Sequence, residues 1–245
     1  MIGMSPVLSR AVALGLASLA LTASIVPAYA GPNLQAGVAL HYYGPTAHPH
    51  CAIPIPYGTS IRTQAYIHSP PWVYAYLLVC NGSTTAGVGK IECGLRYSGR
   101  YDENGGGYPV TIFSWTLCAD AETPVGGWPG PGSGNTIFWG TTHCVRNPDD
   151  DGRPNTAIGI AGYFYLGAYA PVDSVYGISV TRHPGSGNVL VYDCAGNADI
   201  LSPTQGTPHI GELGLGANVG WNPCFEFPVL ARTVSWSTVK ARHAQ

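Results

Sequence analysis

The residues best suited to bind a metal ion lie in one acidic loop. The segment Asn147-Pro148-Asp149-Asp150-Asp151-Gly152 places oxygen-bearing side chains at alternate positions before a glycine. Calcium loops begin in this way, because a hard cation takes several oxygen ligands and the glycine permits the sharp turn. The twelfth position, where a bidentate glutamate completes such loops, is Ile158. We therefore expect either a weak calcium site at Asn147, Asp149 and Asp151 or a solvated acidic turn.

No motif marks a catalytic centre. The sequence has no GxSxG elbow, and its histidines are scattered along the chain. Glycoside hydrolysis would need two carboxylates brought together by the fold. The acids that could supply such a pair lie mostly in or beside turn-like segments: Asp102, Glu103, Asp120, Glu122, Asp173 and Asp193. Solvated acids are the norm in turns, so a hydrolase is the alternative function rather than the favoured one.

Aromatic side chains give the strongest indication of binding. The chain has 6 Trp and 15 Tyr, several of them in loops or at outward strand positions. Flat rings stack on sugars and peptides at a small entropy cost. We expect a ligand face that includes Tyr42, Tyr43, Trp128, Tyr163 and Tyr165. The alternative is that these rings pack in the core, as we expect for Trp115 and Trp139.

The seven cysteines predict disulfides. No CxxC or CxxCH pattern occurs, which argues against zinc, thioredoxin-type chemistry and covalent haem. We expect Cys118–Cys144 and Cys194–Cys224, since each bridge would close a loop of about thirty residues and stabilise the fold by ~3–4 kcal/mol. Cys51, Cys80 and Cys93 compete for a third bridge. We expect Cys51–Cys93, with Cys80 left as a buried thiol.

The first thirty residues differ in kind from the rest. Arg10 is their one charge, residues 11–26 are apolar or small, and Ala28-Tyr29-Ala30 precedes Gly31. This combination is typical of a secretory signal peptide. The alternative, a membrane anchor, would be expected to carry a basic stop-transfer cluster, and none follows. We expect a mature chain of residues 31–245, secreted or periplasmic in a bacterium, with no membrane insertion after cleavage.

The charge balance excludes some partners. Without Arg10 the mature chain has 10 basic residues (11 − 1) and 13 acidic ones, a net charge of −3. Such a balance gives no electrostatic footprint for nucleic acid or anionic lipid. An extracellular protein or a polysaccharide is the expected partner. No cofactor is expected, except calcium if the acidic loop binds it.

Period-two alternation predicts the strands that would position these residues. Ile61–His68 and Lys90–Tyr97 alternate apolar and polar side chains. In 110–118 the alternation changes phase between Ile112 and Phe113, which predicts a β-bulge. Further strands are expected at Gly37–Tyr43, Val73–Cys80, Asn135–Trp139, Thr156–Tyr169, Gly177–Arg182, Asn188–Cys194 and Ile210–Leu215. Turn-forming residues separate them, among them Asn81-Gly82 and two copies of the string PGSGN, at 131–135 and 184–188.

Many short strands without a long helical pattern predict a single all-β domain. We expect an antiparallel β-sandwich over residues 31–234, immunoglobulin-like and stapled by disulfides. Residues 235–245 are expected to form a short helical tail, with Ser235 as the N-cap and Trp236 and Val239 on one face.

Several sequence blocks resemble a family of secreted bacterial proteins without an assigned activity. The blocks are WTLCAD at 115–120, GWP at 127–129 followed by PGSGN, AGYFY at 161–165, and the later pairs DC and NPC. The resemblance spans most of residues 31–224. It implies an exported, cohesin-like sandwich and leaves the function open, because a fold alone does not assign one. The favoured function is a secreted or surface, non-catalytic binding or structural module, and the alternative is a secreted carbohydrate-active hydrolase.

Overall fold

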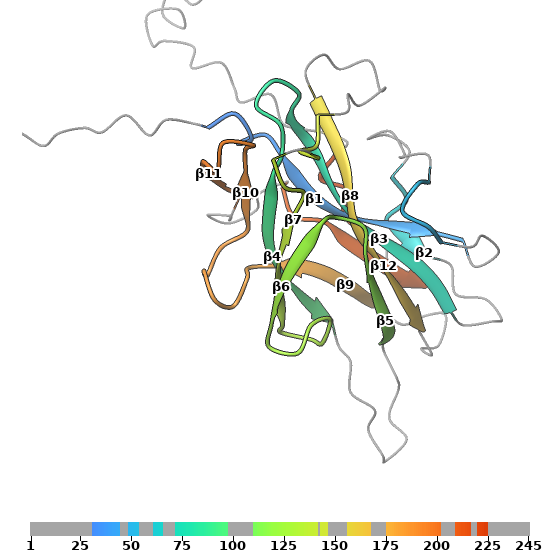
Figure 1. Cartoon of the computed structure of the whole chain (residues 1–245). Helices are drawn as coiled ribbons and strands as arrows, with labels where there is room; N and C mark the ends of the chain where they lie inside the picture. The colour runs from blue at the N-terminus through green and yellow to red at the C-terminus, as the bar shows by residue number, and fades with distance from the viewer. Residues whose placement is uncertain are drawn as a thin grey trace, which may run out of the picture.

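The computed structural model describes ten segments of the chain. They are residues 31–44, 49–53, 61–65, 72–97, 110–141, 143–146, 156–167, 175–201, 209–216 and 220–224. All regular secondary structure within them is β-strand, arranged in two sheets (Figure 1). The predicted β-sandwich is therefore confirmed. The predicted helical tail lies outside the described residues.

The first sheet, which we call sheet A, has four antiparallel strands. Their order across the sheet is β1 (Gly37–Tyr43), β3 (Trp72–Ser83), β8 (Thr156–Gly167) and β5 (Thr111–Leu117). The pairing of β5 with β8 shifts register between Ile112 and Ser114. This shift confirms the predicted bulge.

The second sheet, sheet B, is larger and includes one parallel pair. Its strands are β11 (Ala198–Ile200), β10 (Leu190–Tyr192), β4 (Lys90–Tyr97), β9 (Val175–Thr181), β12 (Glu212–Gly216) and β2 (Gln64–Ala65), with β7 (Gly134–Phe138) on the other side of β4 and β6 (Ala121–Val125) beyond β7. β2 pairs with β12 in parallel, and the other pairs in this sheet are antiparallel. The sandwich is thus antiparallel except at this edge.

The first PGSGN segment and the residues leading into the second lie beside Gly94 in β4. Ser133 accepts a hydrogen bond from the Leu95 amide, and a side chain at Gly94 would meet the carbonyl oxygens of Ser133 at 2.9 Å and Arg182 at 2.5 Å. A side chain at Gly134 would in turn collide with Pro184. The repeated string therefore supplies two turns that close over the same strand.

Apolar side chains fill two cores of unequal size. The main core lies between the sheets and includes Leu77, Ile91, Phe164 and Ile178, all fully buried. A smaller core lies on the outer face of sheet A, where Tyr76, Leu78, Ile158 and Ile160 pack with Ile53 and Ile61. The outer face of sheet A is therefore partly covered by other residues and not fully exposed to solvent. The alternation of apolar and polar residues did not predict this.

The disulfides pair differently from the prediction. The structure joins Cys51 to Cys118, Cys80 to Cys224, and Cys144 to Cys194, while Cys93 is the buried free thiol. The predicted pairs Cys118–Cys144, Cys194–Cys224 and Cys51–Cys93 are therefore wrong, as is the assignment of Cys80 as the thiol. The number of bridges, three, is as expected.

The reason for this error is that the bridges connect residues distant in sequence. The separations are 67, 144 and 50 residues, so no bridge closes a single hairpin loop. Cys93 points into the main core because it alternates with Ile91 and Leu95 on β4. Disulfides persist in oxidising compartments, so the three bridges indicate a protein that works outside the cytoplasm.

Two local readings of the sequence also need correction. Asn81-Gly82 lies inside β3, where Asn81 takes a positive φ of 55° at an irregularity in the pairing with β8, and not in a hairpin turn. β6 was not among the predicted strands; Pro124 lies within it, and proline is unfavourable inside a sheet. Its pairing with β7 alone makes β6 an edge strand, where proline is tolerated.

Within the ranges given above, the structure has no helix with the length and apolar composition needed to cross a membrane.

Candidate functional site

Six aromatic side chains gather on the outer face of sheet A. Cross-strand pairing aligns Tyr43, Tyr74, Tyr165 and Ser114 in one row, and His41, Tyr76, Tyr163 and Thr116 in the next. Residues paired across an antiparallel sheet share a face, so these rows point the same way. We define the aromatic face as Tyr43, Trp72, Tyr74, Phe113, Tyr163 and Tyr165.

Four rings of the aromatic face are in contact with one another. Tyr74 stacks on Tyr165 with centroids 5.1 Å apart, and Phe113 lies 5.2 Å from Tyr165. Tyr74 meets Tyr163 edge-on at 6.3 Å. Such contacts fix the ring orientations before any ligand arrives, which reduces the entropy that binding must remove.

Two features of the backbone bring these rings together. In β8, Tyr163 and Tyr165 point outward while Phe164, between them, packs against Trp115 in the core at 4.6 Å. In β5, the bulge between Ile112 and Ser114 adds one residue, so that Phe113 points outward beside Tyr165 although Trp115, two residues later, contacts the main core.

The aromatic face is accessible and uncharged. Trp72 is 40 % exposed and Phe113 46 %, and the four tyrosines are half-buried. None of the six side chains carries a charge, and the neighbouring His41 is buried. Burial, together with the charge of Arg62, lowers the pKa of His41 to about 4, so this histidine is neutral at physiological pH. The six side chains therefore offer ring surfaces and hydroxyl groups but no charge, and the exposed Arg62, beside His41, lies at the border of the face.

The structure places the predicted aromatic residues in two groups. Tyr43, Tyr163 and Tyr165 lie on the aromatic face. Tyr42 and Trp128 instead contact the main core, where Trp128 packs on Trp115 at 5.4 Å. The expectation that all five share one surface is therefore wrong for Tyr42, which alternates with Tyr43 along β1, and for Trp128, which lies in the turn between β6 and β7.

Tyr74 and Phe113 belong to the face although the sequence did not single them out. The alternation of Trp72, Tyr74 and Tyr76 along one strand was the signal for Tyr74. Phe113 could be placed only through the effect of the bulge.

The predicted calcium loop lies outside the described residues, so calcium binding by Asn147, Asp149 and Asp151 stays a prediction. In the described segments, no group of three or more histidine, cysteine, aspartate or glutamate residues could hold a metal ion.

The described acids of the alternative hydrolase have separate surroundings. Asp120 is exposed and contacts His143 at 3.0 Å. Glu122 accepts hydrogen bonds from Trp115 Nε1 at 2.8 Å and from Asn135 Nδ2 at 2.7 Å. Asp193 accepts hydrogen bonds from Ala195 and Asn197 within its own turn. Asp102, Glu103 and Asp173 lie outside the described residues.

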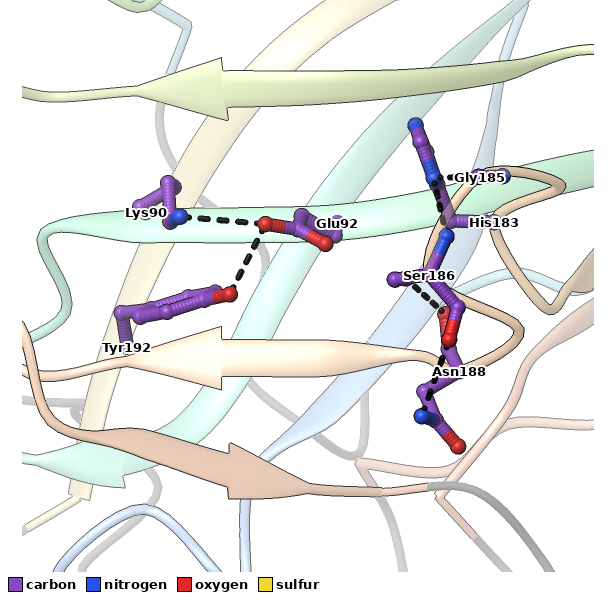
Figure 2. Close-up of polar contacts among 7 residues, drawn as sticks. All are labelled: Lys90, Glu92, His183, Gly185, Ser186, Asn188 and Tyr192. Carbon is purple, nitrogen blue, oxygen red and sulfur yellow. Dashed lines mark hydrogen bonds and ion pairs between the residues drawn. The ribbon is translucent and has the colours of Figure 1, made fainter.

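The outer face of sheet B carries a polar cluster that the sequence did not reveal (Figure 2). Lys90 Nζ lies 3.0 Å from Glu92 Oε1 and 3.4 Å from the centroid of the Tyr192 ring, and the Tyr192 hydroxyl donates to Glu92 at 2.8 Å. Burial alone would raise the pKa of Glu92, but hydrogen bonds from Lys90 and Tyr192 outweigh it and lower this pKa. Burial and the bond to Glu92 raise the pKa of Tyr192. The three side chains thus fix one another's positions through these contacts.

A hollow of about 340 Å³ adjoins this cluster. Phe138, Lys90 and Tyr192 line it together with the backbone of the Cys194–Gly196 turn. The ammonium of Lys90 is already neutralised by Glu92, so the hollow offers less for a charged ligand than its lysine suggests. We call it the Lys90 hollow.

Comparison with known proteins leaves the family of the chain open. No protein-family model matches the chain, and no curated protein matches it. A similar solved structure is the cohesin module of a family 33 glycoside hydrolase from Clostridium perfringens, with 10% identity, a TM-score of 0.40, and coverage of 74% of this chain and 97% of that one. A likeness this distant carries no argument about function, which rests on the side chains described above. The sequence blocks that resemble a secreted bacterial family stay a prediction.

Proposed function

We propose that this protein is a secreted, non-catalytic module that binds a neutral polysaccharide through the aromatic face of sheet A. The observation that carries the proposal is the set of touching, half-exposed rings of Tyr74, Tyr163, Tyr165 and Phe113 on one sheet face. Sugar rings present flat C–H surfaces that stack on aromatic rings, and their hydroxyl groups bond to tyrosine hydroxyls.

The lack of charge on the face favours a polysaccharide that is itself neutral. A charged polymer would form no ion pair with these six side chains, and it would lose hydration on binding. The mature chain, at a net charge of −3, gives no long-range attraction to polyanions either.

The geometry also favours an extended ligand. The rows of the face run across four strands, and neighbouring strands lie about 4.8 Å apart, so the rings form a strip of roughly 15 Å. A strip of this length suits several consecutive sugar units. A protein partner, the other ligand class considered, would normally need a larger interface with an apolar centre and a polar rim.

Affinity electrophoresis in gels that contain a neutral polysaccharide tests the proposal. Xylan, mixed-linkage β-glucan and galactomannan serve as probes. We expect at least one of them to retard the wild-type protein, and Phe113→Ala and Tyr165→Ala each to weaken binding about 5–30-fold, since a central stacked ring contributes about 1–2 kcal/mol.

Phe138→Ala is the matched control, because it removes a ring from the opposite outer face. It should leave retardation unchanged. Loss of binding in Phe138→Ala alone would move the site to the Lys90 hollow. Equal retardation of the wild type and both face variants, or retardation by none of the probes, would contradict the proposal.

A further inference from the structure

The first described residues of the chain lie against a buried carboxylate, that of Asp199. Asp199 of β11 is 5% exposed, and its Oδ2 accepts a hydrogen bond of 2.8 Å from the backbone amide of Asn33. Within the described ranges, no lysine, arginine or histidine lies within ion-pair distance of Asp199. A buried carboxylate with one amide donor keeps unpaired acceptor oxygens, so a cation is the group that this site lacks.

Gly31 lies directly against that carboxylate. A side chain at this position would overlap both oxygens of Asp199, so the close approach requires glycine. The α-nitrogen of Gly31 is two bonds from the β-carbon position that would make this contact. A positive charge on that nitrogen would therefore lie beside the carboxylate.

The segment that carries Gly31 is held firmly. Gly31 accepts a hydrogen bond from the Leu34 amide at 3.2 Å. The fully buried Asn33 side chain accepts from the Ser83 amide at 2.8 Å and donates to the Gly87 carbonyl at 2.9 Å. These bonds tie the segment to the turn between β3 and β4.

The sequence independently places a cleavage point at the same residue. Ala28-Tyr29-Ala30 forms the small-residue exit of the predicted signal peptide, and hydrolysis of the 30–31 peptide bond would leave Gly31 with a free α-amine. Water supplies the atoms: its hydroxyl goes to the Ala30 carbonyl, and its proton goes to the Gly31 nitrogen. The amine, with an ordinary pKa near 8, is then protonated at neutral pH.

We propose that cleavage after Ala30 creates an N-terminal ammonium at Gly31 that forms a buried ion pair with Asp199. Removal of the leader thus completes the fold as well as releasing the chain. The inference is independent of the ligand proposed above and stands or falls without it.

Mass spectrometry of the exported protein gives the first test. The mature chain should begin at Gly31, and any other first residue would overturn the proposal.

The second test is amine labelling of the native protein. Lys90 and Lys240 are the only lysines of the sequence, so few other amines compete for the reagent. Two chains are prepared by cleavage of an N-terminal fusion, one starting at Gly31 and one at Ala30. We expect the α-amine of the Gly31 chain to label at least ten-fold more slowly than that of the Ala30 chain, and equally fast after denaturation.

Thermal unfolding of the same two chains completes the test. The Ala30 chain should melt roughly 5–10 °C lower, because a buried carboxylate loses its partner. Asp199→Asn should remove this difference between the two chains, whereas Asp120→Asn, at an exposed acid, should preserve it. Equal labelling, or a melting difference that survives Asp199→Asn, would refute the ion pair. If Asp199→Asn does not fold, the labelling result alone decides.

Discussion

His41 makes the stability of this protein depend on pH. The ring lies on the outer face of sheet A, 6% exposed, and its Nδ1 accepts a hydrogen bond of 2.9 Å from the Arg62 amide. Protonation would place a charge in the small core and would remove the acceptor for that amide. Burial first, and the charge of Arg62 second, lower the pKa of His41 to about 4 from 6.5.

The sign of the effect follows from which state holds the proton. Between pH 6.5 and pH 4 the unfolded chain protonates His41 and the folded chain does not, so the free energy of unfolding falls as the pH falls. The contribution of this histidine is fully present above pH 6.5. A difference in pKa from 6.5 to about 4 corresponds to a loss of about 2.5 kcal/mol between pH 7 and pH 4.5.

Urea denaturation at pH 7 and pH 4.5 measures this loss, with His41→Asn as the test variant. Asparagine keeps an acceptor for the Arg62 amide but does not titrate, so the variant should lose about 2.5 kcal/mol less than the wild type over this range. His143→Asn is the control, since His143 is exposed beside Asp120. The pKa of His209 is also lowered, mainly by burial, but this residue is unchanged in every chain compared. An identical pH dependence of His41→Asn and wild type would refute the reasoning.

Two further predictions concern the cores. Burial raises the pKa of the Cys93 thiol to about 12, so iodoacetamide at pH 8 should modify it in denaturant but not in the native protein. Non-reducing peptide mapping should recover the three bridges of the structure. Rapid labelling of Cys93 in the native protein would contradict this prediction and show that β4 opens readily. Gly94→Ala should destabilise the protein by about 1–3 kcal/mol, because the methyl group meets two backbone carbonyls that cannot move aside. Gly44→Ala has open space around it and should change stability by less than about 0.5 kcal/mol, so equal melting temperatures of the two variants would contradict this account.

The strands could be predicted from the sequence where one face is buried and the other is exposed to solvent. Gly37–Tyr43 and Lys90–Tyr97 match β1 and β4 at both ends, and the phase change after Ile112 located the bulge. In each case the period of two is a local property of the chain. The strand predicted for 188–194 was too long, because β10 has only three residues. β10 and β9 pair with different parts of the same edge of β4, residues 90–92 and residues 94–97, so each has only part of that strand to pair with.

The disulfide pairing and the aromatic face could not be predicted from local sequence patterns. A bridge such as Cys144–Cys194 depends on which strands are neighbours in space, and spacing along the chain carries no such information. The aromatic face likewise joins residues from four strands, so the sequence identified Tyr163 and Tyr165 as candidates but not their contact with Tyr74. The polar cluster of Lys90, Glu92 and Tyr192 joins β4 to β10, so no local pattern in the sequence predicts it.

The Cys80–Cys224 bridge also determines how the domain bears a mechanical load. A pulling force that enters beyond residue 224 crosses this bond into β3, a central strand of sheet A, without passing through the backbone between the two cysteines. The residues between the two cysteines, which are 144 apart in sequence, form a covalently closed loop that carries no load under tension. While the bridge is oxidised, the chain can lengthen only outside that loop, so a domain held between a cell surface and a polymer would extend by far less than its contour length.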